Sequence, residues 1–213
     1  GHTAGTVRDE EEETVELAVQ QRETALSVQI WKSYVDDMEV SIVNPSGERV
    51  GPFREILGSQ RFYFGGTELL VYYGEPKPYS VRQEIYISFL PRASGTSQNY
   101  VDAGVWQIIL TPRQIVDGRY QMWLPSQNAL QIGTAFLLPA SLATLTIPST
   151  ASQVVTVAAY DGRTFSYADF SGRGADEDPE RASGIKPDLA APGVRVTAPA
   201  PGGGYMEMTG TSF

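Results

Sequence analysis

Residues 14–147 alternate polar and apolar side chains with a period of two, and this pattern constrains the chain more than any other feature. In a β-strand, successive side chains point to opposite faces, so the alternation predicts strands with one buried face. The predicted strands are Thr14 to Val19, Leu26 to Trp31, Met38 to Val43, Arg61 to Phe64, Glu68 to Tyr73, Arg82 to Phe89, Val105 to Leu110 and Arg119 to Leu124. No segment here has a helical period, and burying the alternate apolar residues takes two packed sheets.

Turn signals separate these strands at regular intervals. They are Asn44 to Gly47, the pair Gly65 and Gly66, the pair Ser94 and Gly95, and the pair Asp117 and Gly118. Many short strands with regular turns are typical of an antiparallel β-sandwich or a barrel. We therefore expect a mainly β fold for this part of the chain.

The character of the sequence changes near Pro148. Gln153 to Tyr160 is an almost continuous run of small apolar residues, which is typical of a strand buried on both faces in a parallel sheet. Residues 185–213 are rich in proline and glycine and indicate extended strands and tight turns. The tail from Gln153 to Phe213 is not expected to be a self-sufficient domain. Its open strand edges are expected to pair with a second copy of the chain or, as the alternative, with the rest of a longer ordered chain.

Composition excludes several classes of function. The 213 residues carry a net charge of −9, which disfavours nucleic acid and anionic membrane as partners. The chain has no cysteine, which removes disulfides, thiolate metal sites and thiol nucleophiles. It has one histidine, His2, so no histidine-rich metal site is expected. Nothing in the sequence calls for a metal or a cofactor.

Two short motifs near the end of the chain carry the chemistry. Lys186-Pro-Asp-Leu-Ala-Ala-Pro-Gly193 is followed, after residues 194–209, by Gly210-Thr-Ser-Phe213. Val154 to Tyr160 and Phe165 to Gly172 precede them as a strand and a turn. In order and spacing this region closely resembles the subtilisin-like serine proteases, in which such a KPD-x-x-APG segment precedes the G-T-S nucleophile motif.

The resemblance implies a role for each motif residue. Ser212 would be the catalytic nucleophile, and Thr211 would support the oxyanion and the bound substrate. The alternative for Ser212 is a surface serine without function. Asp188 is expected to be a structural hydrogen-bond acceptor and not a triad acid, and Asp161 and Asp169 are expected to be turn residues.

A serine nucleophile needs a histidine base and an orienting carboxylate, which the family supplies in the order Asp, His, Ser. His2, in the segment His2-Thr-Ala-Gly-Thr6, has no aspartate tens of residues before it, and an acidic run follows it instead of an apolar helix. We therefore expect His2 not to be catalytic, and the chain alone to be inactive.

The remaining two thirds resemble one branch of the family, the Csp germination proteases of spore-forming clostridia. These proteases carry a jelly-roll sandwich inserted into the subtilase domain. The resembling segments are Asn44-Pro-Ser-Gly-Glu48 and Val105-Trp-Gln-Ile-Ile-Leu110 with Trp123-Leu-Pro125. The resemblance implies three parts: an opening segment at 1–13 after the oxyanion turn, a jelly-roll-like antiparallel sandwich at 14–147, and a partial subtilase α/β remnant at 148–213 that ends at the nucleophile.

By resemblance, the chain would be part of a serine endopeptidase that hydrolyses peptide bonds through an acyl-enzyme. Its substrate would be a protein or peptide, such as the zymogen of a spore-cortex lytic enzyme, and its location the bacterial spore or another extracytoplasmic site. The alternative is a non-catalytic sandwich that stabilises or recruits a partner, as in a pseudoprotease or sensor. Trp31, Trp106 and Trp123 would be either core residues or, if two are exposed, a carbohydrate platform.

Overall fold

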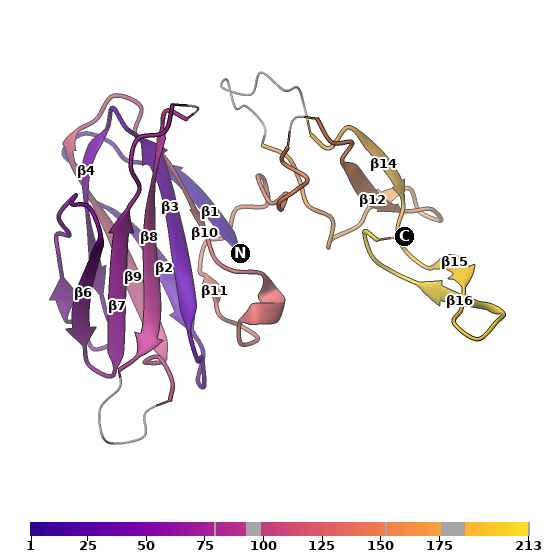
Figure 1. Cartoon of the computed structure of the whole chain (residues 1–213), viewed down its shortest axis with the longest axis horizontal. Coiled ribbons are helices and arrows are strands. Elements are labelled where there is room, and N and C mark those ends of the chain that lie inside the picture. Colours follow the sequence, from indigo (N-terminus) through magenta and orange to yellow (C-terminus); the bar gives the residue numbers. More distant parts are fainter. Residues whose placement is uncertain (79, 93–98, 152, 176–185, 213) are drawn as a thin grey trace. The chain divides into compact units, whose positions relative to one another are not determined.

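The computed structural model describes residues 1–78, 80–92, 99–151, 153–175 and 186–212. The chain divides into two compact units, residues 1–140 and residues 141–213. Both units are built from β-strands (Figure 1), and the prediction of a mainly β fold is confirmed. No helix within the described ranges is long and apolar enough to cross a membrane.

Residues 1–140 form two antiparallel sheets that pack face to face (Figure 1). Within the described residues, the first sheet has six strands in the order β1 (His2–Thr6), β10 (Arg119–Trp123), β3 (Leu26–Ser33), β8 (Arg82–Pro91), β7 (Thr67–Tyr73) and β6 (Ser59–Phe64). The second has five in the order β11 (Ala135–Phe136), β2 (Glu13–Val19), β9 (Gly104–Gln114), β4 (Asp37–Val43) and β5 (Arg49–Val50). A short 3₁₀ helix, η1 (Gln127–Ala129), precedes β11.

The core lies between the two sheets and follows the predicted alternation. In β8, Ile85, Ile87 and Phe89 are fully buried, while the residues between them are half-exposed. Trp106 in β9 packs against Phe89 in β8 of the other sheet, with the two rings edge to face and 5.2 Å between their centroids. All eight strands predicted between residues 14 and 124 are present, because each has a complete apolar face to bury.

One feature of this unit differs from the expectation. His2–Thr6, expected in an opening segment, forms β1 and pairs with β10 along its whole length. Trp106 is a core residue, which was one of the two alternatives, while Trp31 and Trp123 are half-buried, so the three tryptophans do not form one platform. The turns at Asn44 to Gly47, at Gly65 and Gly66, and at Asp117 and Gly118 are where predicted, whereas Ser94 and Gly95 lie outside the described residues.

The described residues of the second unit, 141–213, contain two small sheets. One has the order β13 (Ser166–Tyr167), β12 (Val157–Asp161) and β14 (Leu189–Pro192), and the other pairs β15 (Val196–Pro199) with β16 (Tyr205–Met208). The described part of this unit contains no helix, so only its parallel β12–β14 pair represents the expected α/β remnant.

The second unit begins before Pro148, the residue at which we expected it to start. The amides of Ala143 and Thr144 donate to the carbonyls of Gly174 and Arg173, which ties this connecting segment to the second unit. The strand expected from Gln153 begins only at Val157, and it is buried on both faces only at its centre: Ala158 and Ala159, which point to opposite faces, are buried, whereas Val157 is 44% exposed.

Candidate active site

The candidate site is built on the parallel pair β12 and β14. Val157, Ala158, Ala159 and Tyr160 lie opposite Leu189, Ala190, Ala191 and Pro192, in register. The small side chains of Ala158 and Ala159 let neighbouring segments approach the strand closely. One such neighbour is the buried Ser171, whose hydroxyl accepts a hydrogen bond from the Ala159 amide at 2.9 Å. The turn motif that ends at Gly172 therefore completes the hydrogen bonding of β12.

Lys186 and Asp188 hold the start of β14 against the residues before β12. The Lys186 side chain is buried, and its ammonium donates to the Asp188 carboxylate at 2.6 Å and to the carbonyl of Val154. The same carboxylate oxygen accepts from the Thr156 amide at 2.6 Å. The hydrogen bond from Lys186, together with that from Thr156, lowers the pKa of the Asp188 carboxyl below its ordinary value. The predicted structural role of Asp188 is confirmed.

The two sequence motifs meet at a backbone hydrogen bond. After β14, the Gly193 amide donates to the Tyr160 carbonyl at 2.9 Å, and the Gly210 amide donates to the Gly193 carbonyl at 2.9 Å. A β-carbon at Gly193 would lie 2.7 Å from the Ala159 β-carbon and 3.0 Å from the Gly210 carbonyl oxygen. Glycine is therefore required here by close approach, and it brings the G-T-S motif to the end of the parallel pair.

The residues between the motifs form a hairpin that returns the chain to the same place. β15 and β16 pair from Val196 with Met208 to Pro199 with Tyr205, and the tip contains three glycines at positive φ, Gly202 to Gly204. At the open end of the hairpin, the Arg195 amide donates to the Thr209 hydroxyl at 3.0 Å. Because the hairpin begins and ends at the same place, it returns the chain from Gly193 to Gly210.

Thr211 and Ser212 follow in a turn directly after Gly210, and both are exposed. An exposed serine hydroxyl at the end of a parallel strand pair is accessible to a substrate carbonyl, but it is too weakly acidic to attack without a base. Asp161 was predicted in a turn but is the last residue of β12, and its carboxylate accepts from the Arg163 amide of the following turn at 2.9 Å; Asp169 lies in a turn, as predicted. The roles of Ser212 and Thr211 stay predictions.

His2, the one histidine of the sequence, lies in the other unit. It is buried in β1 with 4% of its surface exposed, and its ring stacks on Trp123 at 4.8 Å between centroids. Because it is buried and stacked in this way, His2 contributes to the packing of the sandwich.

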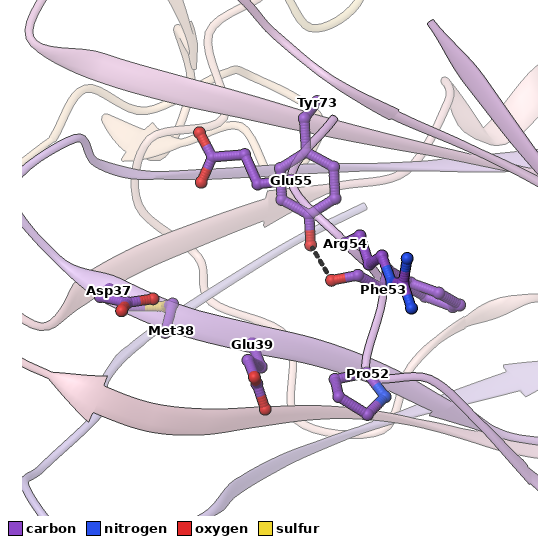
Figure 2. Close-up of a pocket in the computed structure, with 8 residues that line it drawn as sticks. All are labelled: Asp37, Met38, Glu39, Pro52, Phe53, Arg54, Glu55 and Tyr73. Carbon is purple, nitrogen blue, oxygen red and sulfur yellow. Dashed lines mark hydrogen bonds between the residues drawn. The ribbon is translucent and has the colours of Figure 1, made fainter. Parts of the chain in front are cut away.

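The sandwich contains a pocket of about 500 Å³ at one end of β4 (Figure 2). Its lining residues are Asp37, Met38, Glu39, Pro52, Phe53, Arg54, Glu55 and Tyr73. The Tyr73 hydroxyl donates to the Phe53 carbonyl at 3.4 Å, and burial raises the pKa of Tyr73, with Glu55 and Glu39 adding to the effect. Glu39 is paired with Arg113 at 2.7 Å, and Glu55 accepts a hydrogen bond from Gln83, so two of the three carboxylates already have structural partners.

The roles of Gly193, Ser171 and Thr156 in assembling the site were not predicted from the sequence. Gly193 and Ser171 lie inside the motifs Lys186 to Gly193 and Phe165 to Gly172, so these motifs could have indicated that both residues belong to the site. No sequence pattern pointed to Thr156, because its contact with Asp188 depends on how two segments distant in the sequence pair.

Comparisons with known proteins agree with this assembly. Residues 139–213 match the model of the subtilase family. Among solved structures, the chain is similar to the CspB protease of Clostridium perfringens, with a TM-score of 0.86 and 30% identity, over 99% of this chain and 42% of that chain. The chain thus spans less than half the length of that protease, and the search of curated proteins found no match. These findings confirm the resemblance: residues 139–213 are similar to the subtilase family, and the chain as a whole is similar to part of a Csp protease.

Proposed function

We propose that the chain contributes the nucleophile of a serine endopeptidase. Ser212 attacks the carbonyl carbon of the scissile peptide bond, and Thr211 supports the oxyanion that forms. The observation that carries the proposal is the hydrogen bond between Gly210 and Gly193, which joins the G-T-S motif to the APG motif at the end of β14. The match of residues 139–213 to the subtilase family supports the same assignment.

The reaction needs a base that takes the proton of Ser212 and later delivers it to the leaving amine. His2 is buried against Trp123 in the sandwich, so we assign the base and its carboxylate to polypeptide additional to these 213 residues. The similar CspB protease is longer than this chain, which is compatible with that assignment. The isolated chain is then inactive, because a serine without its base retains only a small residual rate.

The substrate that we propose is a polypeptide, and specifically the zymogen of a spore-cortex lytic enzyme, from the resemblance to the Csp branch. The sandwich, which has its own core in residues 1–140, then serves as a stabilising or recruiting module that takes no part in the chemistry. A protease whose triad is incomplete would leave this second role as the function of the chain.

A fluorophosphonate probe tests the proposal, because it reacts only with a serine that a base activates. In the complete protein that carries this chain, we expect labelling that is lost in Ser212→Ala and kept in Ser166→Ala, which removes another hydroxyl exposed in the same unit. The isolated chain should not be labelled. A complete protein that is not labelled would refute the catalytic proposal, and labelling of the isolated chain that depends on Ser212 would refute the assignment of the base.

A further inference from the structure

The outer face of the six-stranded sheet carries a group of aromatic side chains. This aromatic face consists of Trp31, Tyr63, Tyr72, Tyr86 and Trp123. Tyr63 is 53% exposed and Tyr72 is 38% exposed, while the other three are half-buried. The inner faces of the same strands are filled by buried aliphatic residues such as Ile30, Val71 and Ile87, so the core does not account for these rings.

The outer face of the five-stranded sheet is different. Within the described residues of β2, β4 and β9 it carries no aromatic side chain; its members are Thr14, Glu16, Ala18, Glu39, Ser41, Val43, Val105, Gln107, Ile109 and Thr111. Ion pairs such as Arg113 with Glu39 and Arg49 with Glu12 lie on or beside this sheet. Strand propensity favours aromatic residues on either sheet, so their restriction to one outer face calls for another explanation.

The strand register places four of these residues in two rows. In the first row, Tyr72 lies opposite Tyr86, Tyr86 opposite Gln29, and Gln29 opposite Trp123. In the next row, Glu84 lies opposite Trp31 and Trp31 opposite Gln121. Neighbouring strands are about 4.8 Å apart, so Tyr86 and Trp123, with β3 between them, are separated by about 10 Å.

Polar groups stand between the rings and are already held in place. The Gln29 amide donates to a Glu84 carboxylate oxygen at 3.1 Å, which fixes an amide and a carboxylate between Tyr86 and the two tryptophans. The Trp123 ring is stacked on the buried His2, and Tyr72 and Tyr86 form a ring pair at 6.2 Å. Fixed side chains lose little conformational entropy on binding a ligand.

We propose that the aromatic face binds a β-1,4-linked pyranose chain. A pyranose ring presents a face of C–H groups, which packs on an aromatic ring, and an edge of hydroxyls, which bond to amides and carboxylates. In an extended β-1,4 chain, equivalent sugar faces recur once per disaccharide, a length close to the spacing of about 10 Å between Tyr86 and Trp123. Gln29 and Glu84 would bond to the hydroxyls of the sugar between them.

Two other ligand classes fit the face less well. A single-stranded nucleic acid would also stack on aromatic rings, but it needs a basic groove. This chain has a net charge of −9, and on this face Arg61 is paired with Glu68 at 2.8 Å while Glu84 stands beside the rings. A protein partner needs a contiguous apolar centre, whereas polar residues such as Gln29 and Gln121 separate these rings. The site shares no residue with the proposed proteolytic function and goes beyond it.

The test is calorimetric titration of the full 213-residue chain with chitohexaose and cellohexaose, with tryptophan fluorescence as a second readout. We expect one or both β-1,4 hexaoses to bind and maltohexaose, whose α-1,4 chain is helical, not to bind. Tyr86→Ala should weaken binding by about tenfold, because it removes a central contact ring. Tyr86→Phe, which keeps the ring, should bind normally, as should Val105→Ala on the other sheet.

Near-ultraviolet circular dichroism shows whether each variant is folded, and Tyr72→Ala at the exposed end of the row replaces Tyr86→Ala if the latter unfolds. The proposal is overturned if neither β-1,4 hexaose binds, if maltohexaose binds equally well, or if both alanine variants bind like the unchanged chain. It is also overturned if the only effect of removing the ring is loss of self-association, since the face would then be a protein contact.

Discussion

Asp36 joins two connections that each run from one sheet of the sandwich to the other, and its replacement by alanine should destabilise that unit strongly. The residue lies between β3 and β4 and is only 2% exposed. Its carboxylate accepts hydrogen bonds from three consecutive amides of the turn between β9 and β10: Val116 and Asp117 at 2.8 Å each, and Gly118 at 3.0 Å. Asp36→Ala leaves all three donors without this acceptor.

The three bonds do not contribute equally. The bond to Gly118 is buried, so losing it leaves an amide that water cannot reach, at a cost of roughly 1–3 kcal/mol. The bonds to Val116 and Asp117 are partly buried, and water can replace the carboxylate there at a cost of about 1 kcal/mol each. The free energy of unfolding should therefore fall by about 3–5 kcal/mol, a large part of the 5–15 kcal/mol of a typical domain.

Urea unfolding followed by tryptophan fluorescence measures this change for the sandwich alone, because all three tryptophans lie in residues 1–140. Asp37→Ala is the matched control: it removes the same charge at the next position, from an exposed side chain, and should change stability by about 0.5 kcal/mol or less. If Asp36→Ala unfolds at the same urea concentration as Asp37→Ala, with the same slope, the reasoning from the three amide bonds is wrong.

Three further predictions concern the core and the candidate site. Trp106→Ala, at a fully buried position, should cost the sandwich about 3–5 kcal/mol in urea unfolding followed by far-ultraviolet circular dichroism; a cost under about 1 kcal/mol would contradict the packing. Gly193→Ala should cost the second unit about 1–3 kcal/mol, because the new methyl group meets Ala159, and hydrogen exchange should show faster opening around Gly193. The lowered pKa of Asp188 means that its contribution to stability is present above the ordinary carboxyl pKa and is lost as the pH falls through the lowered value. The amide proton shift of Thr156 in NMR should therefore titrate with a midpoint below pH 3.8, the ordinary value, and Asp188→Asn should abolish that titration.

Much of the sandwich could be predicted because strand formation there depends on local pattern. The run from Leu26 to Trp31 alternates as predicted: its even-numbered residues are buried and its odd-numbered residues are half-buried, so Trp31 lies outside the core. The candidate nucleophile could likewise be predicted from two short motifs, because their residue types and spacing are specific. The subtilase part was recognised in this way before any contact was known.

The tertiary structure decided what pairs with what. The same alternation that leaves Trp31 half-exposed buries Lys32, and the backbone carbonyls of Asp36 and Ser33, which accept from its ammonium at 2.8 and 3.3 Å, make that burial tolerable. Strand pairing joins residues far apart in the chain, so β1 could not be assigned to the sandwich before its pairing with β10 was seen. For the same reason, the motifs indicated the residue types of the site, but only the bond between Gly210 and Gly193 brought them together: close approach depends on the packing of both segments, which no local pattern records.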